Sequence, residues 1–144
     1  MPPRNRLLRT VLALAAAAVL AFLLTPDASH GGEPAAVPKI PPAPEGFALD
    51  GDLERGRELF VDHCAVCHGE RGEADGKLSP HLKPPPGNLP ERVGERSDWE
   101  LYLVVRDGGQ AVGRSPVMVG FGERLDERAL VDVATFARSL QKSE

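Results

Sequence analysis

Apolar positions recur at helical spacing in several parts of the chain, a pattern that predicts helices joined by turn-rich segments. The first predicted helix covers about residues 52–66, and its apolar side is formed by Leu53, Leu59 and Phe60. Gly56 lies inside this helix, where a glycine costs about 1 kcal/mol relative to alanine. We therefore expect another helix to approach closely at Gly56.

A second helix is predicted to begin after Ser97. Ser97 and Glu100 have the S-x-x-E spacing of a capping box, in which each side chain accepts a hydrogen bond from the other residue's free backbone N–H. Apolar positions follow at helical spacing: Leu101, Val104 and Val105. Gly108 and Gly109 are expected to end the helix, because glycine tolerates the left-handed conformation found there.

The clearest helical pattern lies near the carboxyl end. Its apolar residues repeat at the i, i+3, i+4, i+7 spacing: Leu130, Val133, Phe136, Ala137 and Leu140. Asp126 is the predicted N-cap. Residues 69–96 contain five prolines and no periodicity, so they predict a long loop, which in a small domain is functional or wrapped around something. No strand pattern of comparable strength appears.

The amino-terminal residues have the composition of an export signal. Arg4, Arg6 and Arg9 precede an uncharged apolar run over residues 10–24. This run is shorter than the about 20 residues that span a bilayer comfortably, and the cleavage site is poor. Residues 1–25 are thus predicted to be a signal peptide or an N-terminal membrane anchor, both of which place the protein in the periplasm or on the outer face of the cytoplasmic membrane.

Residues 26–49 contain six prolines and no apolar period. They are predicted to be an extended Pro-rich linker, serving either as a tether from a retained anchor or as the leader of a secreted protein. The folded domain is then expected over residues 50–144. A domain of this size buries little surface, so a bound cofactor is expected to add stability. The formal net charge of −4 argues against nucleic acid as a partner.

Cys64, Cys67 and His68 form a C-x-x-C-H string, the attachment motif for c-type haem. Two thiols three positions apart at a helix end can each add to one haem vinyl group, and the imidazole that follows reaches the iron. We therefore predict one haem c, held covalently through both cysteines, with His68 as an iron ligand. Attachment after export agrees with the amino-terminal signal.

The cysteine pair has three other interpretations. A thioredoxin-like redox pair would lie in an α/β pattern, which the sequence lacks. A zinc site built from His63, Cys64, Cys67 and His68 is cramped, because consecutive residues rarely converge on one tetrahedral ion. A simple disulfide between Cys64 and Cys67 is the third.

Haem iron in an electron carrier needs a second axial ligand, which is commonly methionine. Apart from the initiator Met1, the chain contains only Met118, in a glycine-rich region before the last helix. The alternative is a methionine that fills a gap in the core. The weaker candidates are the remaining histidines: His30, His63 and His81.

Residues 50–140 resemble a class I cytochrome c, and within that group the single-domain cytochromes related to the haem subunits of cbb-type oxidases. The matching positions are Gly56, Phe60, the C-A-V-C-H string, Gly69, Gly72, Asp75-Gly76, the proline run at 84–86, Met118 and residues 125–140. Two positions depart from the pattern. Val119 follows Met118 where many relatives have proline, and Ala74 stands where many have glycine.

The resemblance implies an all-α fold, with three main helices and long loops around one covalently attached haem. It implies that the first and last helices cross at Gly56, Phe60 and Phe136. It also implies that a carbonyl of the proline run accepts a hydrogen bond from the His68 ring.

These patterns favour a monohaem one-electron carrier that is not itself an enzyme. His68 and Met118 would hold the iron in both oxidation states, and the partners would be redox proteins: a dehydrogenase, an oxidase or a reductase. Acidic residues near the motif would help docking or form a solvated face: Glu70, Glu73 and Asp75. Two alternatives stay open: a haem-carrying electron-transfer subunit of a larger membrane or periplasmic oxidoreductase, and a gas-binding haem sensor in which Met118 does not bind iron.

Overall fold

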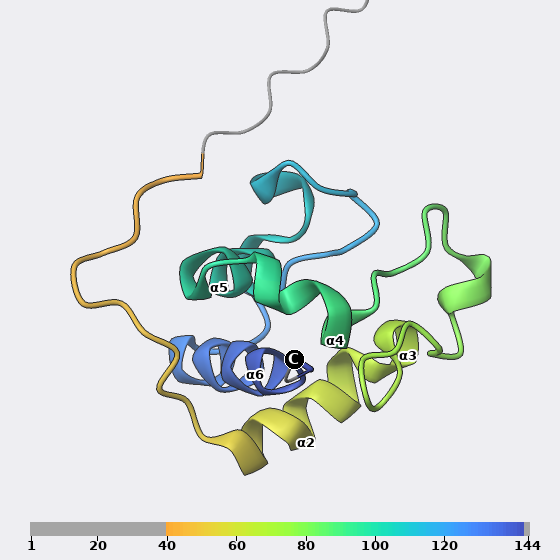
Figure 1. The fold of residues 1–144 in the computed structure, drawn as a ribbon, viewed down its shortest axis with the longest axis horizontal. Helices are drawn as coiled ribbons and strands as arrows, with labels where there is room; N and C mark the ends of the chain where they lie inside the picture. The colour runs from red at the N-terminus through yellow and green to blue at the C-terminus, as the bar shows by residue number, and fades with distance from the viewer. Residues whose placement is uncertain (1–39, 143–144) are drawn as a thin grey trace, which may run out of the picture. The chain divides into compact units, whose positions relative to one another are not determined.

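All regular secondary structure in residues 40–142, which the computed structural model describes, is helical (Figure 1). The α-helices are α2 (Leu53–His63), α3 (Ala65–His68), α4 (Leu89–Arg92), α5 (Asp98–Asp107) and α6 (Glu127–Ser139). The short 3₁₀ turns are η2 (Ser79–His81), η3 (Val93–Glu95) and η4 (Gln110–Val112). The predicted all-α class is confirmed. Residues 1–25 and most of the predicted linker lie outside the described residues. Among residues 40–142, no helix is long and apolar enough to cross a bilayer.

Helix α6 packs against both α2 and α5, and its crossing with α2 is the one that the resemblance implied. The ring centroids of Phe60 and Phe136 lie 5.2 Å apart. A Cβ added to Gly56 would come within 3.0 Å of the Phe136 Cβ and 2.8 Å of the Asp132 carbonyl carbon. Glycine at 56 therefore allows the two helix backbones to touch, which explains its presence inside a helix.

A fully buried carboxylate lies within this crossing. Asp132 is 0% exposed, and its Oδ1 accepts a hydrogen bond from the Asp52 backbone N–H at 2.7 Å. Arg55 Nε lies 2.8 Å from Oδ2, and Arg128 Nε lies 3.3 Å from Oδ1. A buried charge is tolerated only when it is paired and hydrogen-bonded. The Asp52 N–H supplies a hydrogen bond at Oδ1 and the two arginines supply the opposite charge, while Oδ2 has the Arg55 ion pair without full hydrogen-bond geometry. Asp132 thereby ties the start of α2 to α6.

The predicted helix starts at α5 and α6 are confirmed. Ser97 Oγ accepts from the Glu100 N–H at 3.2 Å, and Glu100 Oε2 accepts from the Ser97 N–H at 3.0 Å, which completes the capping box. Asp126 Oδ1 accepts from the Ala129 N–H at 2.8 Å. Gly108 ends α5 with a positive φ of 87°.

The first helix is not continuous to residue 66 as predicted. Helix α2 ends at His63 and α3 begins at Ala65, with Cys64 as a turn residue between them at a φ of −110° and a ψ of −35°. Residues 69–96 also differ from the expected irregular loop, since they contain η2, α4 and η3. Proline lies in the first turn of both η2 and α4, where its fixed φ suits a helix start. Helices this short leave no periodicity to detect.

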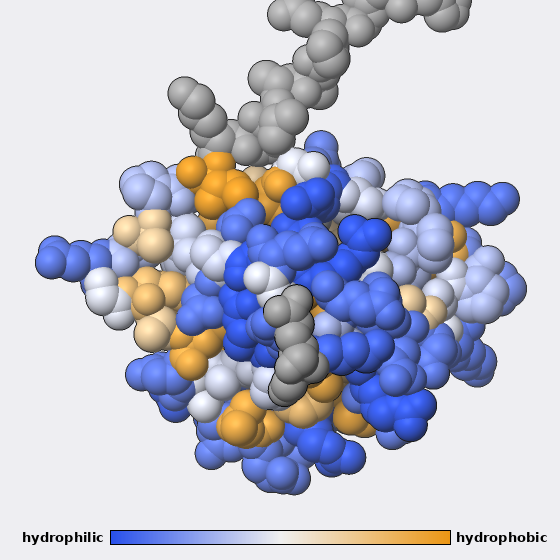
Figure 2. All heavy atoms as spheres, in the orientation of Figure 1, coloured by the Kyte–Doolittle hydropathy of each residue, from blue (hydrophilic) through white to orange (hydrophobic). Residues whose placement is uncertain are grey.

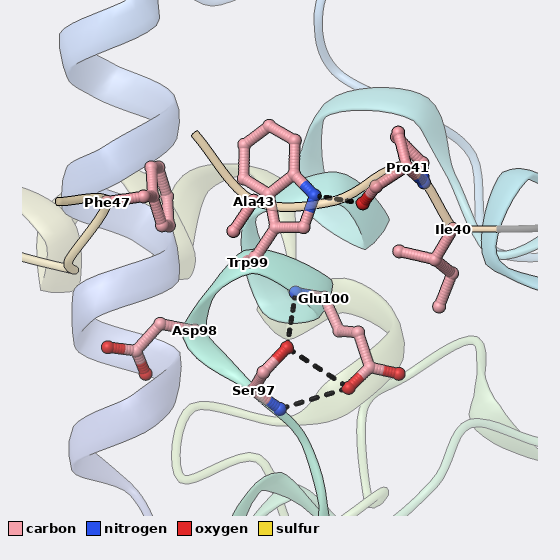
Figure 3. A pocket seen from close by; sticks show the side chains of 8 residues that line it. All are labelled: Ile40, Pro41, Ala43, Phe47, Ser97, Asp98, Trp99 and Glu100. Carbon is pink, nitrogen blue, oxygen red and sulfur yellow. Dashed lines mark hydrogen bonds between the residues drawn. The ribbon is translucent and has the colours of Figure 1, made fainter. Parts of the chain in front are cut away.

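Residues 40–49, which composition assigned to the linker, pack against α5 (Figure 3). Trp99 Nε1 donates a hydrogen bond to the Pro41 carbonyl at 2.8 Å. The Phe47 ring lies 4.9 Å from the Trp99 ring and 5.4 Å from the Tyr102 ring. Between this segment and the start of α5 is an open cleft of about 470 Å³. The packed part of the chain therefore begins before residue 50.

Candidate functional site

Cys64, Cys67 and His68 are held together by one turn of backbone. The Cys64 carbonyl accepts hydrogen bonds from the Cys67 N–H at 3.1 Å and from the His68 N–H at 2.9 Å. Cys64 is buried, Cys67 is half-buried, and both are free thiols. The break between α2 and α3 thus presents two thiols and an imidazole from consecutive positions of a single tight turn.

The loop after the motif is bound closely to this turn. The Leu78 N–H donates to the Val66 carbonyl and the Ala74 N–H to the His68 carbonyl, each at 2.8 Å. A Cβ on Gly76 would lie 2.5 Å from the Ala65 oxygen, a distance that real Cβ atoms do not reach. Gly76 is therefore needed where the loop crosses the backbone of α3.

The surroundings of His68 favour the neutral form of its imidazole. Burial lowers the pKa of His68 from its ordinary value, and a hydrogen-bond interaction with the Gly87 backbone opposes this in part. No partner in residues 40–142 meets the buried Nδ1 atom with full hydrogen-bond geometry. The neutral imidazole is the form that binds metals. Gly87 directly follows the proline run, and the implied hydrogen bond from the His68 ring to a carbonyl of that run stays a prediction.

The cysteine environment disfavours the thioredoxin-like and zinc alternatives. Burial, with a smaller contribution from Cys67, raises the pKa of the Cys64 thiol to about 12, whereas the nucleophilic cysteine of a redox pair has a lowered pKa. No group of three His, Cys, Asp or Glu side chains in the described part of the chain is arranged to hold a metal ion.

Met118 lies in the loop between α5 and α6. Its half-buried side chain packs against the hydrophobic core cluster that also contains Cys64. Its carbonyl accepts a hydrogen bond from the Gly109 N–H at 2.9 Å, and its N–H donates to the Ser115 carbonyl at 3.3 Å. The fold thus fixes the main chain of Met118 and turns its side chain toward the protein interior.

The other histidines are placed less favourably for binding a group held at Cys64 and Cys67. His63 is exposed at the end of α2, with its ring 5.9 Å from that of Phe121. His81 is exposed in η2. His30 lies outside the described residues.

The residues present fit a covalently held haem. The two free thiols, the half-buried imidazole and the thioether of the core-packed Met118 are the donor types that such a group requires. Asn88 Oδ1 is a further buried atom that meets no hydrogen-bond partner in residues 40–142. Sequence patterns identified Gly109 only as a helix-ending residue and did not identify Gly87, because both act near the site through backbone groups.

The sequence matches the cytochrome c family over residues 53–141. It is 32% identical over 92 residues to the gluconate 2-dehydrogenase cytochrome c subunit of Pantoea cypripedii, covering 60% of this chain and 20% of that protein. It is 53% identical over 36 residues to a cytochrome c-553-like protein of Synechocystis sp., covering 25% of this chain and 32% of that one. The chain thus spans at most about a third of these relatives' lengths.

A chain of the Kuenenia stuttgartiensis reducing HAO-like protein complex shares the fold. The two superpose with a TM-score of 0.54 at 24% sequence identity, over 66% of this chain and 44% of that chain. The family match runs from the first residue of α2 to beyond the end of α6 and includes the C-x-x-C-H turn. The chain belongs to the cytochrome c family, as a class I monohaem c-type cytochrome.

Proposed function

We propose that the protein transfers single electrons through one haem c attached at Cys64 and Cys67, with His68 and Met118 as the axial ligands. The observation that carries the proposal is the half-buried His68 imidazole, with its Nδ1 atom buried, that directly follows two free thiols on one tight turn. When bound, the haem supplies a one-electron Fe(III)/Fe(II) couple.

The chain's own contribution is to hold both ligands still. The Cys64 carbonyl and the loop bound to α3 fix the orientation of His68, while the loop between α5 and α6 fixes Met118. Rigid ligands keep the reorganisation on electron transfer small. A thioether ligand raises the reduction potential, which suits an acceptor of electrons from a dehydrogenase.

The proposed location is outside the cytoplasmic membrane, with residues 1–25 as the export signal or anchor. The partner is a redox protein that docks beside the haem-binding residues. Exposed aliphatic side chains lie next to those residues in sequence or through a backbone hydrogen bond: Val66, Leu78, Val117 and Val119. Leu53 is the remaining large hydrophobic side chain exposed in residues 40–142. Figure 2 shows one face of the molecule covered mostly by hydrophilic residues with small separate apolar areas.

A second candidate role is that of a haem-carrying subunit in a larger oxidoreductase. The likeness to a dehydrogenase cytochrome c subunit favours this role. Copurification of the full chain with a membrane or periplasmic oxidoreductase supports it, whereas a freely exchanging monomer supports the mobile carrier.

The test of ligation is the visible spectrum of the matured protein, oxidised, reduced, and reduced with CO. We expect a low-spin spectrum, the weak red band of methionine–iron coordination, and no change with CO. Met118→Ala should abolish the red band and allow CO to bind. A wild-type protein that is high-spin or binds CO overturns the Met118 assignment and favours the gas sensor, and absence of covalent haem overturns the whole proposal.

A further inference from the structure

The segment that contains Met118 runs along the carboxyl end of α5. The Phe121 N–H donates to the Val105 carbonyl, and the Gly122 N–H to the Arg106 carbonyl, each at 2.9 Å. The last carbonyls of a helix have no partner within the helix. Here the segment after Met118 supplies those partners, so its position is set by the end of α5.

Glycines on both sides make this contact possible. A Cβ on Gly108 would lie 2.7 Å from the Met118 oxygen. On the facing segment, a Cβ on Gly120 would lie 2.5 Å from the Arg106 oxygen and 2.6 Å from the Asp107 carbonyl carbon. Because real Cβ atoms do not approach so closely, a side chain on either segment would force the two backbones apart.

Gly109 holds both ends of the Met118 loop. Its N–H donates to the Met118 carbonyl at 2.9 Å, and its carbonyl accepts from the Arg114 N–H at 2.7 Å. A Cβ on Gly109 would lie 3.2 Å from the Met118 Cβ and would overlap the Ser115 carbonyl oxygen. The φ and ψ of Gly109 are −64° and −36°, an ordinary helical conformation. Glycine is therefore required at 109 for the contact, not for the backbone conformation.

We infer that Gly109 is the positioning residue for the Met118 thioether. Because Gly109 has no Cβ, the Met118 backbone can lie close to the end of α5. The hydrogen bond from the Gly109 N–H then holds the Met118 carbonyl in that position. The inference rests on the proposed function, in which Met118 binds the iron. A ligand bond tolerates displacements of only about 0.2 Å, so a shift of the Met118 backbone by the width of a methyl group would detach the thioether.

The test is Gly109→Ala in the full-length, haem-loaded protein. Alanine fits the backbone conformation of residue 109, so the substitution adds only the close contacts of its Cβ with the Ser115 carbonyl and the Met118 Cβ. The matched control is Gly94→Ala, where the added Cβ meets only the flexible Gln141 side chain, with Nε2 at 2.8 Å. We expect Gly109→Ala to lose the red methionine–iron band, to bind CO when reduced and to show a lowered reduction potential. Gly94→Ala should match the wild type in all three.

Retention of the red band and of CO resistance in Gly109→Ala overturns the inference while leaving the proposed function intact. Absence of the band in the wild type itself instead overturns the proposed function. If Gly109→Ala does not yield haem-loaded protein, amide hydrogen exchange in the wild type tests the coupling between Gly109 and Met118 instead. Displacing the methionine with added imidazole should accelerate exchange at the Gly109 amide, and unchanged exchange contradicts the coupling.

Discussion

The backbone N–H of Asp52 donates a 2.7 Å hydrogen bond to Oδ1 of Asp132, a residue eighty positions away in the chain. This bond joins the N-cap of α2 to the middle of α6, at the point where Gly56 lets the two helices touch. Helix α2 leads directly into Cys64. The buried Asp132 carboxylate therefore fixes the position of the helix that leads into the C-x-x-C-H turn.

Asp132→Ala should destabilise the haem-loaded protein by about 1.5–3 kcal/mol, the net contribution of a hydrogen bond to a charged group. The arginines that lose Asp132 are half exposed and regain water, so the larger cost of a stranded buried charge does not apply. The measurement is urea denaturation. Asp50→Ala is the control, because it removes only the exposed 3.5 Å pair with Arg128 and should cost no more than about 0.5 kcal/mol. Equal effects would contradict a special role for Asp132.

Gly76→Ala should block covalent haem attachment. The added Cβ would lie 2.5 Å from the Ala65 oxygen and from the Cys67 carbonyl carbon, so the turn that presents both thiols must open. Haem staining of the denatured protein and its intact mass measure attachment. Gly94→Ala is the control, since its added Cβ meets only the flexible Gln141 side chain, with Nε2 at 2.8 Å. Normal attachment in Gly76→Ala would show that the turn tolerates opening.

Ala74→Gly should stabilise the protein. Ala74 has a φ of 64°, a conformation that costs a residue with a Cβ about 1–2 kcal/mol. Glycine removes this cost, but its extra freedom in the unfolded chain lowers the free energy of unfolding by about 0.5–1 kcal/mol. The net gain is expected to reach about 1 kcal/mol, seen as a higher urea midpoint. Ala111→Gly, in η4 without a positive φ, should instead lower it. A lower midpoint for Ala74→Gly would refute the strain argument.

Stability should fall at alkaline pH through Tyr102. Burial raises the pKa of this tyrosine above its ordinary value of 10, and its 2.7 Å hydrogen bond to Glu127 adds to the effect. As the pH rises past that value, the unfolded chain loses the phenol proton before the folded one does, so unfolding becomes more favourable. Tyr102→Phe should be less stable at neutral pH by about 1 kcal/mol.

Tyr102→Phe should also lose less stability than the wild type above that pH. Urea denaturation of both proteins at neutral and alkaline pH measures the difference. Parallel stability curves for the two proteins would mean that the Tyr102 phenol ionises equally easily in the folded and unfolded states.

Phe47→Ala should destabilise the domain although Phe47 lies in the Pro-rich segment. Its half-buried ring contacts Trp99 and Tyr102, and losing such a contact costs about 1–3 kcal/mol. Pro42→Ala, at an exposed position of the same segment, should leave the urea midpoint unchanged. Identical midpoints for the two variants would show that residues 40–49 do not contribute to the folded unit.

The sequence by itself determined the features that depend on neighbouring residues. The cap at Ser97, the cap at Asp126 and the C-x-x-C-H turn each rely on interactions within about one helical turn, so residue type and spacing are enough to predict them. The family resemblance then extended this local information to the crossing of Phe60 with Phe136.

Only the tertiary structure decided the contacts between segments far apart in the chain. Three hydrogen bonds join positions that no periodicity links: Asp52 to Asp132, Trp99 to Pro41, and Gly109 to Met118. Each depends on a backbone group or a missing Cβ, which carry no hydrophobic signal. Such groups acquire a partner only after the helices have packed, because packing is what brings the distant backbone within hydrogen-bonding distance.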